Sequence, residues 1–267
     1  GISQGTGVVM SADGYIITNA HVIEGSFRAD VVLEDGGQYE ALLVGSDAAT
    51  DLAVLKIDAQ GLTPAEFGDS DQMEVGDVVV AIGNPMGEEL RGTMTDGILS
   101  AINRDMEVEG RQMTLLQTTA ALNTGNSGGA LINDMGQVIG ITNMKLMAYN
   151  STVEGLGFAI PTTRVKQVVA PPIAGAPVTR PSLGIIVRRG QGENGGLVVE
   201  EVDPDSDCHR QGIQPQDIIV AANGQQVQTF ADLERIKRTL DVGDSLLLEV
   251  LRGGEHLEFT VTLMDQD

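Results

Sequence analysis

A serine, a histidine and an aspartate in the first half of the chain have the types and spacing needed for nucleophilic catalysis. Ser127 lies in the segment Gly125-Asn126-Ser127-Gly128-Gly129, whose glycines permit backbone conformations and close approaches that a β-carbon forbids. A serine hydroxyl is a weak nucleophile unless a base removes its proton, and histidine is the usual base at neutral pH. His21 is the only histidine before residue 170, so it is the one candidate base in this part of the chain.

A histidine that acts as a base needs a carboxylate to orient its ring and to stabilise the imidazolium. Asp51 directly precedes the apolar segment Leu52–Ile57, where an unpaired carboxylate would be costly. Each of the three residues also has an ordinary explanation: a flexible turn around the serine, a helix start at His21 and a strand-edge cap at Asp51. Their order along the chain is that of chymotrypsin-type proteases, so together they predict a catalytic triad.

Short strands separated by turns are expected around these residues. Hairpins are predicted around the turns at 11–14 and 34–37, and a mostly buried strand follows at Leu52–Ile57. After a break at 61–70, further strands are expected at 77–82, 95–101, 113–118, 130–132, 138–142 and 156–160. This spacing, with few helices, predicts a mostly β, two-lobed barrel or sandwich architecture.

A change in composition separates a second unit from the first. A short helix is expected at 162–170, and four of the nine prolines then fall within 171–182, which predicts an extended linker. The second unit is expected to contain strands at 183–187, 196–202, 217–222, 245–251 and 257–263, with helices at 205–211 and 229–240. We therefore expect a protease domain at 1–170, a linker at 171–182 and a second domain at 183–267.

Composition excludes several classes of function. The net charge is −22, and acidic residues outnumber basic ones by 22 to 9 up to residue 182 and by 16 to 7 after it. Such uniform acidity argues against nucleic acid or an anionic membrane as a partner, since both require clustered Lys and Arg. Cys208 is the single cysteine, so no intrachain disulfide is expected, and we interpret it and His209 as structural residues.

Several motifs resemble the HtrA (Deg) family of serine proteases, and the resemblance covers nearly the whole chain. The stretch Tyr39–Ile57 is most similar to the DegS/AlgW type within that family. The segments that carry the resemblance are Gly5-Thr6-Gly7-Val8-Val9, Thr18-Asn19-Ala20-His21-Val22-Ile23, Thr50-Asp51-Leu52-Ala53-Val54-Leu55-Lys56-Ile57, Gly83-Asn84-Pro85, Gly125-Asn126-Ser127-Gly128-Gly129 and Gly155-Leu156-Gly157-Phe158-Ala159-Ile160-Pro161.

The resemblance implies a chymotrypsin-like double β-barrel and assigns roles to individual residues. It makes Ser127 the nucleophile, His21 the base and then acid, and Asp51 the orienting carboxylate. The backbone N–H groups of Gly125 and Ser127 would form the oxyanion hole, where each donor contributes roughly 3–4 kcal/mol to transition-state stabilisation. No cofactor or metal ion is implied.

The resemblance also bears on specificity and regulation. Trypsin-like enzymes keep an aspartate six residues before the nucleophile, whereas this chain has Ala121 there, followed by Leu122, so cleavage after small or medium aliphatic residues is expected. Arg104 matches an arginine on a loop that relays the state of the second domain to the active site. Gln117 lies where this relay would contact the activated loop. A solvated surface arginine is the alternative interpretation of Arg104.

Residues Ser182-Leu183-Gly184-Ile185, after the linker, resemble the start of a PDZ domain. In such a loop, the backbone N–H groups at Leu183, Gly184 and Ile185 bind the terminal carboxylate of a peptide, while the adjoining strand pairs with it. An ordinary strand start is the alternative. The family more often has an aromatic residue where Ser182 stands.

The resemblance implies an ATP-independent serine endopeptidase of the bacterial periplasm or cell envelope, acting in protein quality control or stress signalling. Its expected partners are unfolded or membrane-anchored protein substrates, hydrophobic C-terminal peptides at the PDZ domain, and two further copies in a homotrimer. No nucleic-acid partner is expected. The alternative is a peptide-binding sensor or chaperone whose protease domain rests. Sequence alone leaves open whether an anchor precedes Gly1 or a second PDZ domain follows Asp267.

Overall fold

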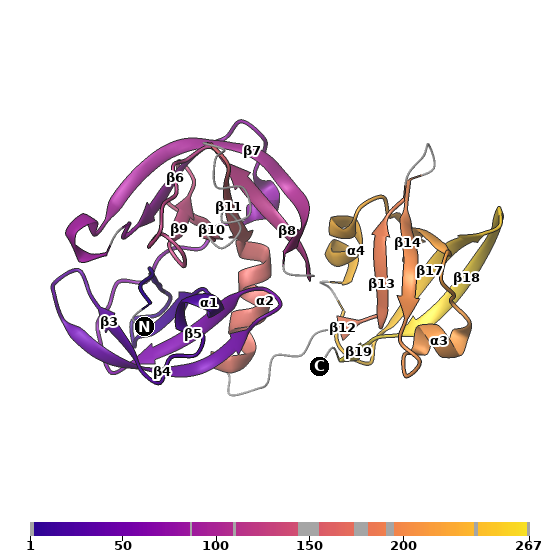
Figure 1. The fold of residues 1–267 in the computed structure, drawn as a ribbon, viewed down its shortest axis with the longest axis horizontal. Coiled ribbons are helices and arrows are strands. Elements are labelled where there is room, and N and C mark those ends of the chain that lie inside the picture. The colour runs from indigo at the N-terminus through magenta and orange to yellow at the C-terminus, as the bar shows by residue number, and fades with distance from the viewer. Residues whose placement is uncertain are drawn as a thin grey trace. The chain divides into compact units, whose positions relative to one another are not determined.

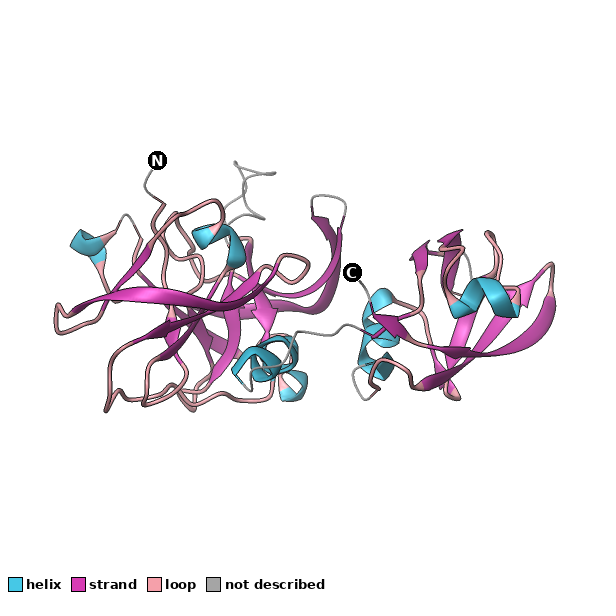
Figure 2. Ribbon diagram, turned by 90° about the horizontal axis from the view of Figure 1, so that it is seen from below, coloured by secondary structure: helices cyan, strands magenta, loops and turns pink. Residues whose placement is uncertain are grey.

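The computed structural model describes residues 3–265 except 86, 109–110, 144–154, 174–180, 191–194 and 238–239. The chain divides into two compact units, residues 1–178 and 179–267. Strands dominate both units (Figure 2). In the described part of the chain, no helix is long and apolar enough to cross a membrane.

The first lobe of unit 1 is built on a five-stranded antiparallel sheet in the order β1-β2-β5-β4-β3 (Figure 1). Its elements are β1 (Val8–Val9), β2 (Tyr15–Thr18), α1 (Ala20–Ile23), β3 (Ala29–Val32), β4 (Gln38–Asp47) and β5 (Leu52–Ile57). Both predicted hairpins and the predicted strand at Leu52–Ile57 are confirmed. The first turn depends on Gly14, whose φ is +102° and where a β-carbon would lie 2.5 Å from the Ile57 carbonyl oxygen.

The second lobe closes into a barrel in the order β10-β11-β8-β7-β6-β9. Its elements are η1 (Ser70–Gln72), β6 (Val78–Gly83), η2 (Glu88–Leu90), β7 (Thr93–Val108), β8 (Arg111–Thr118), β9 (Ala130–Ile132), β10 (Val138–Thr142) and β11 (Gly157–Pro161). Of the two barrels that the resemblance implied, the described strand pairings close this second one and leave the first lobe as a sheet.

The long strand β7 corrects the prediction of a strand at 95–101. Its pairing with β8 shifts register between Leu99 and Ala101 and again between Ala101 and Arg104, and Asn103 adopts a φ of +50°. Each shift moves the following side chains to the opposite face, so the alternation of polar and apolar residues is interrupted. The sequence pattern therefore indicated only the first half of this strand.

One hydrophobic cluster joins the two lobes of unit 1 and helix α2 (Thr162–Ile173). Its buried members come from both lobes and the helix: Val8, Ile17, Leu52, Val54, Met113, Leu115, Val138, Ile141, Phe158, Ile160, Val165, Val168 and Val169. Burial of a side chain of this size stabilises the fold by roughly 1.5–3 kcal/mol, so this cluster holds the lobes against each other.

The predicted linker at 171–182 is wrong at both of its ends. Helix α2 continues to Ile173, and Pro181–Ser182 form the short strand β12, which pairs with β19 (Met264–Asp265). The prolines misled the prediction because they are typical of extended linkers, whereas α2 includes two of them, Pro171 and Pro172, before it ends at Ile173.

Unit 2 is a mixed fold around one antiparallel sheet with strand order β13-β14-β15-β17-β18 and with β16 paired to β15. Its further elements are β13 (Ile185–Arg189), β14 (Leu197–Val202), α3 (Asp207–Gln211), β15 (Ile218–Ala222), β16 (Gln225–Gln226), α4 (Phe230–Lys237), β17 (Ser245–Arg252) and β18 (Glu255–Thr262). Strand β13 lies at the edge of the sheet among the described strands, and α4 packs beside it (Figure 1).

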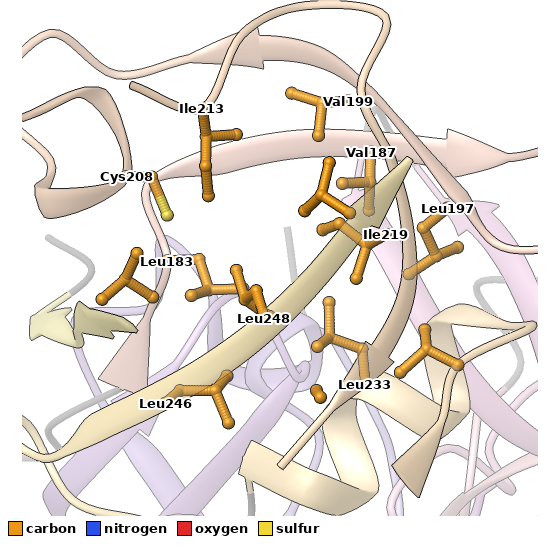
Figure 3. Close-up of a cluster of buried hydrophobic side chains, with 14 of the residues drawn as sticks. Leu183, Val187, Leu197, Val199, Cys208, Ile213, Ile219, Leu233, Leu246 and Leu248 are labelled. Atoms are coloured by element: carbon orange, nitrogen blue, oxygen red, sulfur yellow. The ribbon is translucent and has the colours of Figure 1, made fainter. Parts of the chain in front are cut away.

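The core of unit 2 is aliphatic, as the scarcity of aromatic residues leads one to expect. Leu183, Val199, Ile219 and Leu248 are among its buried members, and the Cys208 sulfur points into the same cluster (Figure 3). Burial raises the pKa of the Cys208 thiol to about 12, with a smaller contribution from the negative charge of Asp207. Such a thiol stays protonated and unreactive at neutral pH.

Candidate active site

The first lobe positions the histidine and the aspartate from two neighbouring strands. His21 lies on α1 directly after β2, and Asp51 directly precedes β5, which pairs with β2. The His21 Nδ1 atom lies 2.6 Å from Asp51 Oδ2, and the His21 backbone N–H donates to Asp51 Oδ1 at 2.8 Å. One carboxylate therefore fixes both the ring and the backbone of the histidine.

Asp51 is itself held in an uncommon backbone conformation. Its φ is +55°, in the left-handed region that costs a non-glycine residue about 1–2 kcal/mol. Its carbonyl oxygen accepts from the Ala20 N–H at 3.1 Å and from Asn19 Nδ2 at 2.9 Å. These hydrogen bonds offset the backbone strain and keep the carboxylate beside His21 Nδ1. Strained backbone conformations of this kind cluster at functional sites.

Ser127 reaches the same histidine from the second lobe. Its Oγ lies 3.1 Å from His21 Nε2, although the two residues are 106 positions apart in sequence. A carboxylate only accepts hydrogen bonds, so Asp51 places the imidazole proton on Nδ1 and leaves Nε2 as the acceptor for the serine hydroxyl. The three predicted residues thus form a continuous serine–histidine–aspartate chain with buried or half-buried side chains.

The turn before Ser127 has the geometry of an amide-donor site. The Asn126 N–H donates to the Asn123 carbonyl at 2.9 Å, and Gly125 has a φ of +102° while Thr124 has a negative one. These are the features of a type II turn, which requires glycine or asparagine at its third position. Among the described residues, the Gly125 N–H has no hydrogen-bond partner.

Sequence reasoning missed a fourth side chain at the aspartate. Asn143 directly follows β10, is 1% exposed, and its Nδ2 donates to Asp51 Oδ2 at 2.8 Å. Asp51 Oδ2 is the oxygen that also faces the His21 ring. A polar residue at the end of a buried strand was the available signal, but its partner lies 92 residues away and is brought near by the fold.

Ala121 and Leu122 lie on the segment between β8 and the turn at 123–126 that precedes Ser127, which we call the nucleophile turn. Ala121 is exposed, and its carbonyl oxygen accepts from Thr95 Oγ1 at 2.7 Å. Leu122 is 7% exposed and packs against β11, where a β-carbon at Gly157 would come within 2.9 Å of Leu122 Cδ1. The apolar Leu122 side chain therefore lies beside β11, and neither Ala121 nor Leu122 carries a charge.

Arg104 and Gln117 lie on the paired strands β7 and β8. Gln117 is opposite Ala101 and its Nε2 donates to Ser100 Oγ at 3.0 Å, whereas the exposed Arg104 is opposite Leu115. The structure places Arg104 within β7 rather than on the loop that the resemblance implied, and in the register of β7 with β8 Arg104 is not the residue opposite Gln117. It does not bring either residue to the triad.

The second candidate site is the loop that leads into β13. Gly184 has a φ of +66°, and its carbonyl oxygen accepts from the Asp203 N–H at 2.8 Å. Its N–H donates to Ser182 Oγ at 3.1 Å. Leu183 is 4% exposed and belongs to the core of unit 2, while Ile185 begins the edge strand. One of the three predicted carboxylate-binding amides is thus engaged by a neighbouring hydroxyl.

Known proteins share both units. Residues 5–141 match the trypsin-like peptidase domain, and residues 181–263 match the PDZ domain. The chain is 42% identical to the serine protease Do-like HtrB of Bacillus subtilis, over 98% of this chain and 62% of that protein. It is 38% identical to the serine endoprotease DegS of Haemophilus influenzae, over 97% of this chain and 76% of that protein.

A solved structure of the HtrA-type protease AlgW with a decapeptide superposes with a TM-score of 0.80 at 36% identity. The match covers 98% of this chain and 83% of the AlgW chain. The prediction of a mostly β, trypsin-like domain followed by a PDZ domain is confirmed by these comparisons. The chain belongs to the HtrA family of serine proteases.

Proposed function

We propose that this chain is an ATP-independent serine endopeptidase in which Ser127, His21 and Asp51 form the catalytic triad. The observation that carries the proposal is the pair of distances at the histidine, 2.6 Å from Nδ1 to Asp51 and 3.1 Å from Nε2 to Ser127 Oγ. Both lie within the range that proton transfer between a serine and a base requires.

The chemistry follows from these contacts. His21 Nε2 takes the Ser127 proton as Oγ bonds to the peptide carbonyl carbon, and Asp51 stabilises the imidazolium that forms. The imidazolium then gives its proton to the departing amine, and an acyl-enzyme remains. A water molecule, deprotonated by the same ring, attacks the acyl carbon and releases the acid, which restores the serine hydroxyl.

The backbone N–H groups of Gly125 and Ser127 are the proposed oxyanion donors. The type II turn gives Gly125 the positive φ that only glycine adopts at low cost, and its N–H has no partner among the described residues. Two amides directed at the developing negative oxygen lower the barrier by roughly 3–4 kcal/mol each.

The proposed substrates are proteins cut after small or medium aliphatic residues. Leu122 is buried against β11, and Ala121 carries no charge that could pair with a basic side chain. A site without a counter-ion disfavours a buried Lys or Arg strongly. A peptide-library cleavage assay tests this: cleavage after Val or Ala supports the assignment, and dominant cleavage after Arg or Lys overturns it.

Regulation by the second domain is the remaining part of the proposal. Proteolysis is assigned to residues 1–170 and binding of hydrophobic C-terminal peptides to 183–267, through the amides of Leu183, Gly184 and Ile185. The edge position of β13 beside α4 supports this, because a peptide can pair with an open strand edge. Arg104 and Gln117 are proposed to relay the occupied state to the nucleophile turn.

The cellular setting is proposed from the relatives. Names such as "probable periplasmic serine endoprotease DegP-like", from Halomonas elongata, support a role in the bacterial periplasm or cell envelope, in protein quality control or stress signalling. Unfolded or membrane-anchored proteins are the proposed substrates. A homotrimer is the proposed assembly, and a native mass measurement tests it.

The decisive experiment compares casein turnover by the wild-type chain and by Ser127→Ala, each with and without a peptide that ends in a hydrophobic residue. We expect turnover by the wild type, stimulated by the peptide, and a loss of about 10⁴-fold or more in Ser127→Ala. His21→Ala should behave like Ser127→Ala, whereas His256→Ala, at an exposed histidine of unit 2, should keep its activity. Peptide binding without turnover under every condition would instead favour a peptide sensor.

A further inference from the structure

Thr6 makes hydrogen bonds to both sides of the catalytic centre. It lies just before β1, and its N–H donates to the Ser127 carbonyl at 2.8 Å. Its hydroxyl donates to the Gly125 carbonyl at 2.7 Å. Its own carbonyl accepts from Thr18 Oγ1 at 2.7 Å, at the end of the strand that leads to the histidine. One residue therefore links the turn that carries the nucleophile to the strand that carries the base.

The two carbonyls that Thr6 holds flank the proposed oxyanion donors. The Gly125 carbonyl belongs to the peptide unit that follows the Gly125 N–H, and the Ser127 carbonyl to the unit that follows the Ser127 N–H. Each of these carbonyls shares a planar peptide unit with the next N–H along the chain, that of Asn126 or that of Gly128. Thr6 therefore fixes the peptide units on both sides of the unit that carries the Ser127 N–H. A carbonyl that rotated towards the reacting oxygen would repel the negative charge that develops there.

The hydroxyl of Thr6 is itself oriented by a third segment. A threonine hydroxyl has one proton, which it gives to the Gly125 carbonyl, so the Asn84 N–H, 3.0 Å away, must be a donor to its oxygen. Asn84 Oδ1 in turn accepts from the Gly92 N–H at 2.9 Å. The segment after β6 thus selects the direction in which the Thr6 hydroxyl points.

Backbone contact leaves little freedom at this junction. Gly128 has a φ of +84°, and a β-carbon there would overlap the Thr6 carbonyl oxygen and the Thr18 hydroxyl. At Gly5, a β-carbon would meet Val22 Cγ1 at 2.6 Å and the Ser127 carbonyl oxygen at 3.1 Å. The segment around Thr6 therefore lies directly against the nucleophile turn.

We propose that Thr6 is a positioning residue for the oxyanion hole: it holds the Gly125 and Ser127 carbonyls away from the reacting oxygen and fixes the peptide units on both sides of the one that carries the Ser127 N–H. The proposal rests on the proposed peptidase function. The Thr6 side chain reaches the site through its hydrogen bond to the Gly125 carbonyl. Loss of that bond should therefore weaken stabilisation of the transition state and lower kcat, with little effect on substrate binding.

The test compares Thr6→Val, which keeps the shape and loses the hydroxyl, with Thr6→Ser, which keeps the hydroxyl. Removing one oxyanion donor outright lowers kcat by about 10²–10³-fold, so loss of a group that holds the peptide units beside a donor should lower it by about 10-fold or more. We expect this fall in Thr6→Val with KM within about twofold, and recovery to within about threefold in Thr6→Ser. Affinity for a peptide aldehyde, whose adduct places an oxygen among the same amides, should fall in parallel with kcat.

Thr162→Val is the matched control. Thr162 is buried, and its Oγ1 also donates to a carbonyl, that of Gly68, and accepts from a backbone N–H, that of Ser70, both at 3.2 Å. It lies at the start of α2, outside the catalytic contacts, so its loss should lower the melting temperature without a comparable fall in kcat.

Failure of this proposal is distinguishable from failure of the proposed function. A wild-type chain without turnover would contradict the function itself. A folded Thr6→Val with wild-type kcat and aldehyde affinity would overturn the role of Thr6 and leave the function standing. Thr6→Cys, which has a similar size and a much weaker donor, is measured alongside in case the valine variant does not fold. Wild-type kcat in Thr6→Cys would likewise contradict the proposal.

Discussion

In the proposed function, the nucleophile turn and the loop before β13 perform the same task, the presentation of backbone N–H groups to a negative oxygen. Both depend on a glycine with positive φ, Gly125 at +102° and Gly184 at +66°. The nucleophile turn is held by Thr6, 119 positions away from Gly125. The Gly184 N–H is instead occupied by Ser182 Oγ, two positions away.

In the nucleophile turn, the Gly125 N–H has no partner among the described residues, whereas in the loop before β13 the Gly184 N–H already donates to a side chain of the same loop. An N–H group without a partner among the described residues, such as that of Gly125, can stabilise a charge without first giving up a hydrogen bond, as an oxyanion hole requires. A donor that already has a partner must exchange it when a ligand arrives, so part of the binding free energy is lost. The first arrangement suits catalysis and the second suits reversible peptide binding.

The largest expected effect comes from Gly128→Ala, which breaks the support of the nucleophile turn. The new β-carbon would overlap the Thr6 carbonyl and the Thr18 hydroxyl at a φ of +84°. Strain and overpacking together should destabilise the protein by about 2–5 kcal/mol. We expect turnover to fall by about 10³-fold or more, a loss larger than that expected for any one displaced oxyanion donor, measured as kcat/KM with calorimetry in parallel.

Gly136→Ala is the control for that change. Gly136 has a φ of +78° but nothing within 4 Å of the added carbon, so it isolates the cost of the backbone conformation. We expect about 1–2 kcal/mol of destabilisation and nearly unchanged kcat/KM. Equal effects of the two substitutions on turnover would show that close backbone contact does not organise the nucleophile turn.

Gly184→Ala makes the corresponding change in the second loop. The new carbon would lie 2.5 Å from Ser206 Cβ and 3.0 Å from Met264 Sδ, which are side-chain atoms that can shift more easily than backbone. We expect the dissociation constant for a hydrophobic C-terminal peptide to rise by about 10- to 100-fold, since about 1–3 kcal/mol of strain falls on a donor loop. Titration calorimetry measures this, with Gly224→Ala, in open space at a φ of +72°, as control.

If Gly184→Ala and Gly224→Ala both bound the peptide with wild-type affinity, the peptide site would lie elsewhere in unit 2. Basal casein turnover serves as an internal reference, because both glycines belong to unit 2 and the triad residues belong to unit 1.

Asn143→Ala tests how far the first site depends on distant contacts. The substitution removes one of the two donors to Asp51 Oδ2, and a hydrogen bond to a charged group contributes about 1.5–3 kcal/mol. Because His21 retains its own bonds to both carboxylate oxygens, we expect only part of this in catalysis, about a 10-fold fall in kcat with a small change in KM.

The control for Asn143→Ala is Asn133→Ala, at another buried asparagine whose side chain supports the turn at 133–137. It should lower thermal stability and leave kcat nearly unchanged. A fall in kcat of equal size in both variants would attribute the effect of Asn143 to general loss of packing.

The smallest expected effect comes from Ser182→Ala, which frees the Gly184 N–H for a ligand. An intramolecular hydrogen bond is worth about 0.5–1.5 kcal/mol net, so removing its competition should tighten peptide binding by about 2- to 10-fold. Ser182→Thr, which keeps the hydroxyl, should bind like the wild type. Weaker binding in Ser182→Ala would show that the hydroxyl supports the loop and does not compete with the peptide.

The sequence by itself determined the strands with regular patterns and the identity of the triad candidates. Strand β5 and the hairpin of β1 and β2 follow from alternation and turn residues within about ten positions, a range over which local preferences act. His21 could be singled out because it is the only histidine in the first 170 residues. Asp51 and Ser127 followed from the chemistry that a histidine base requires.

Only the tertiary structure decided what supports those residues. The hydroxyl of Thr6 meets Gly125, and Asn143 meets Asp51, because the barrel and its neighbouring sheet bring together positions 119 and 92 residues apart. The register shifts of β7 likewise depend on its pairing with β8. Side-chain chemistry is written into the local sequence, but the partner of a buried donor is set by strand pairing and core packing over the whole unit.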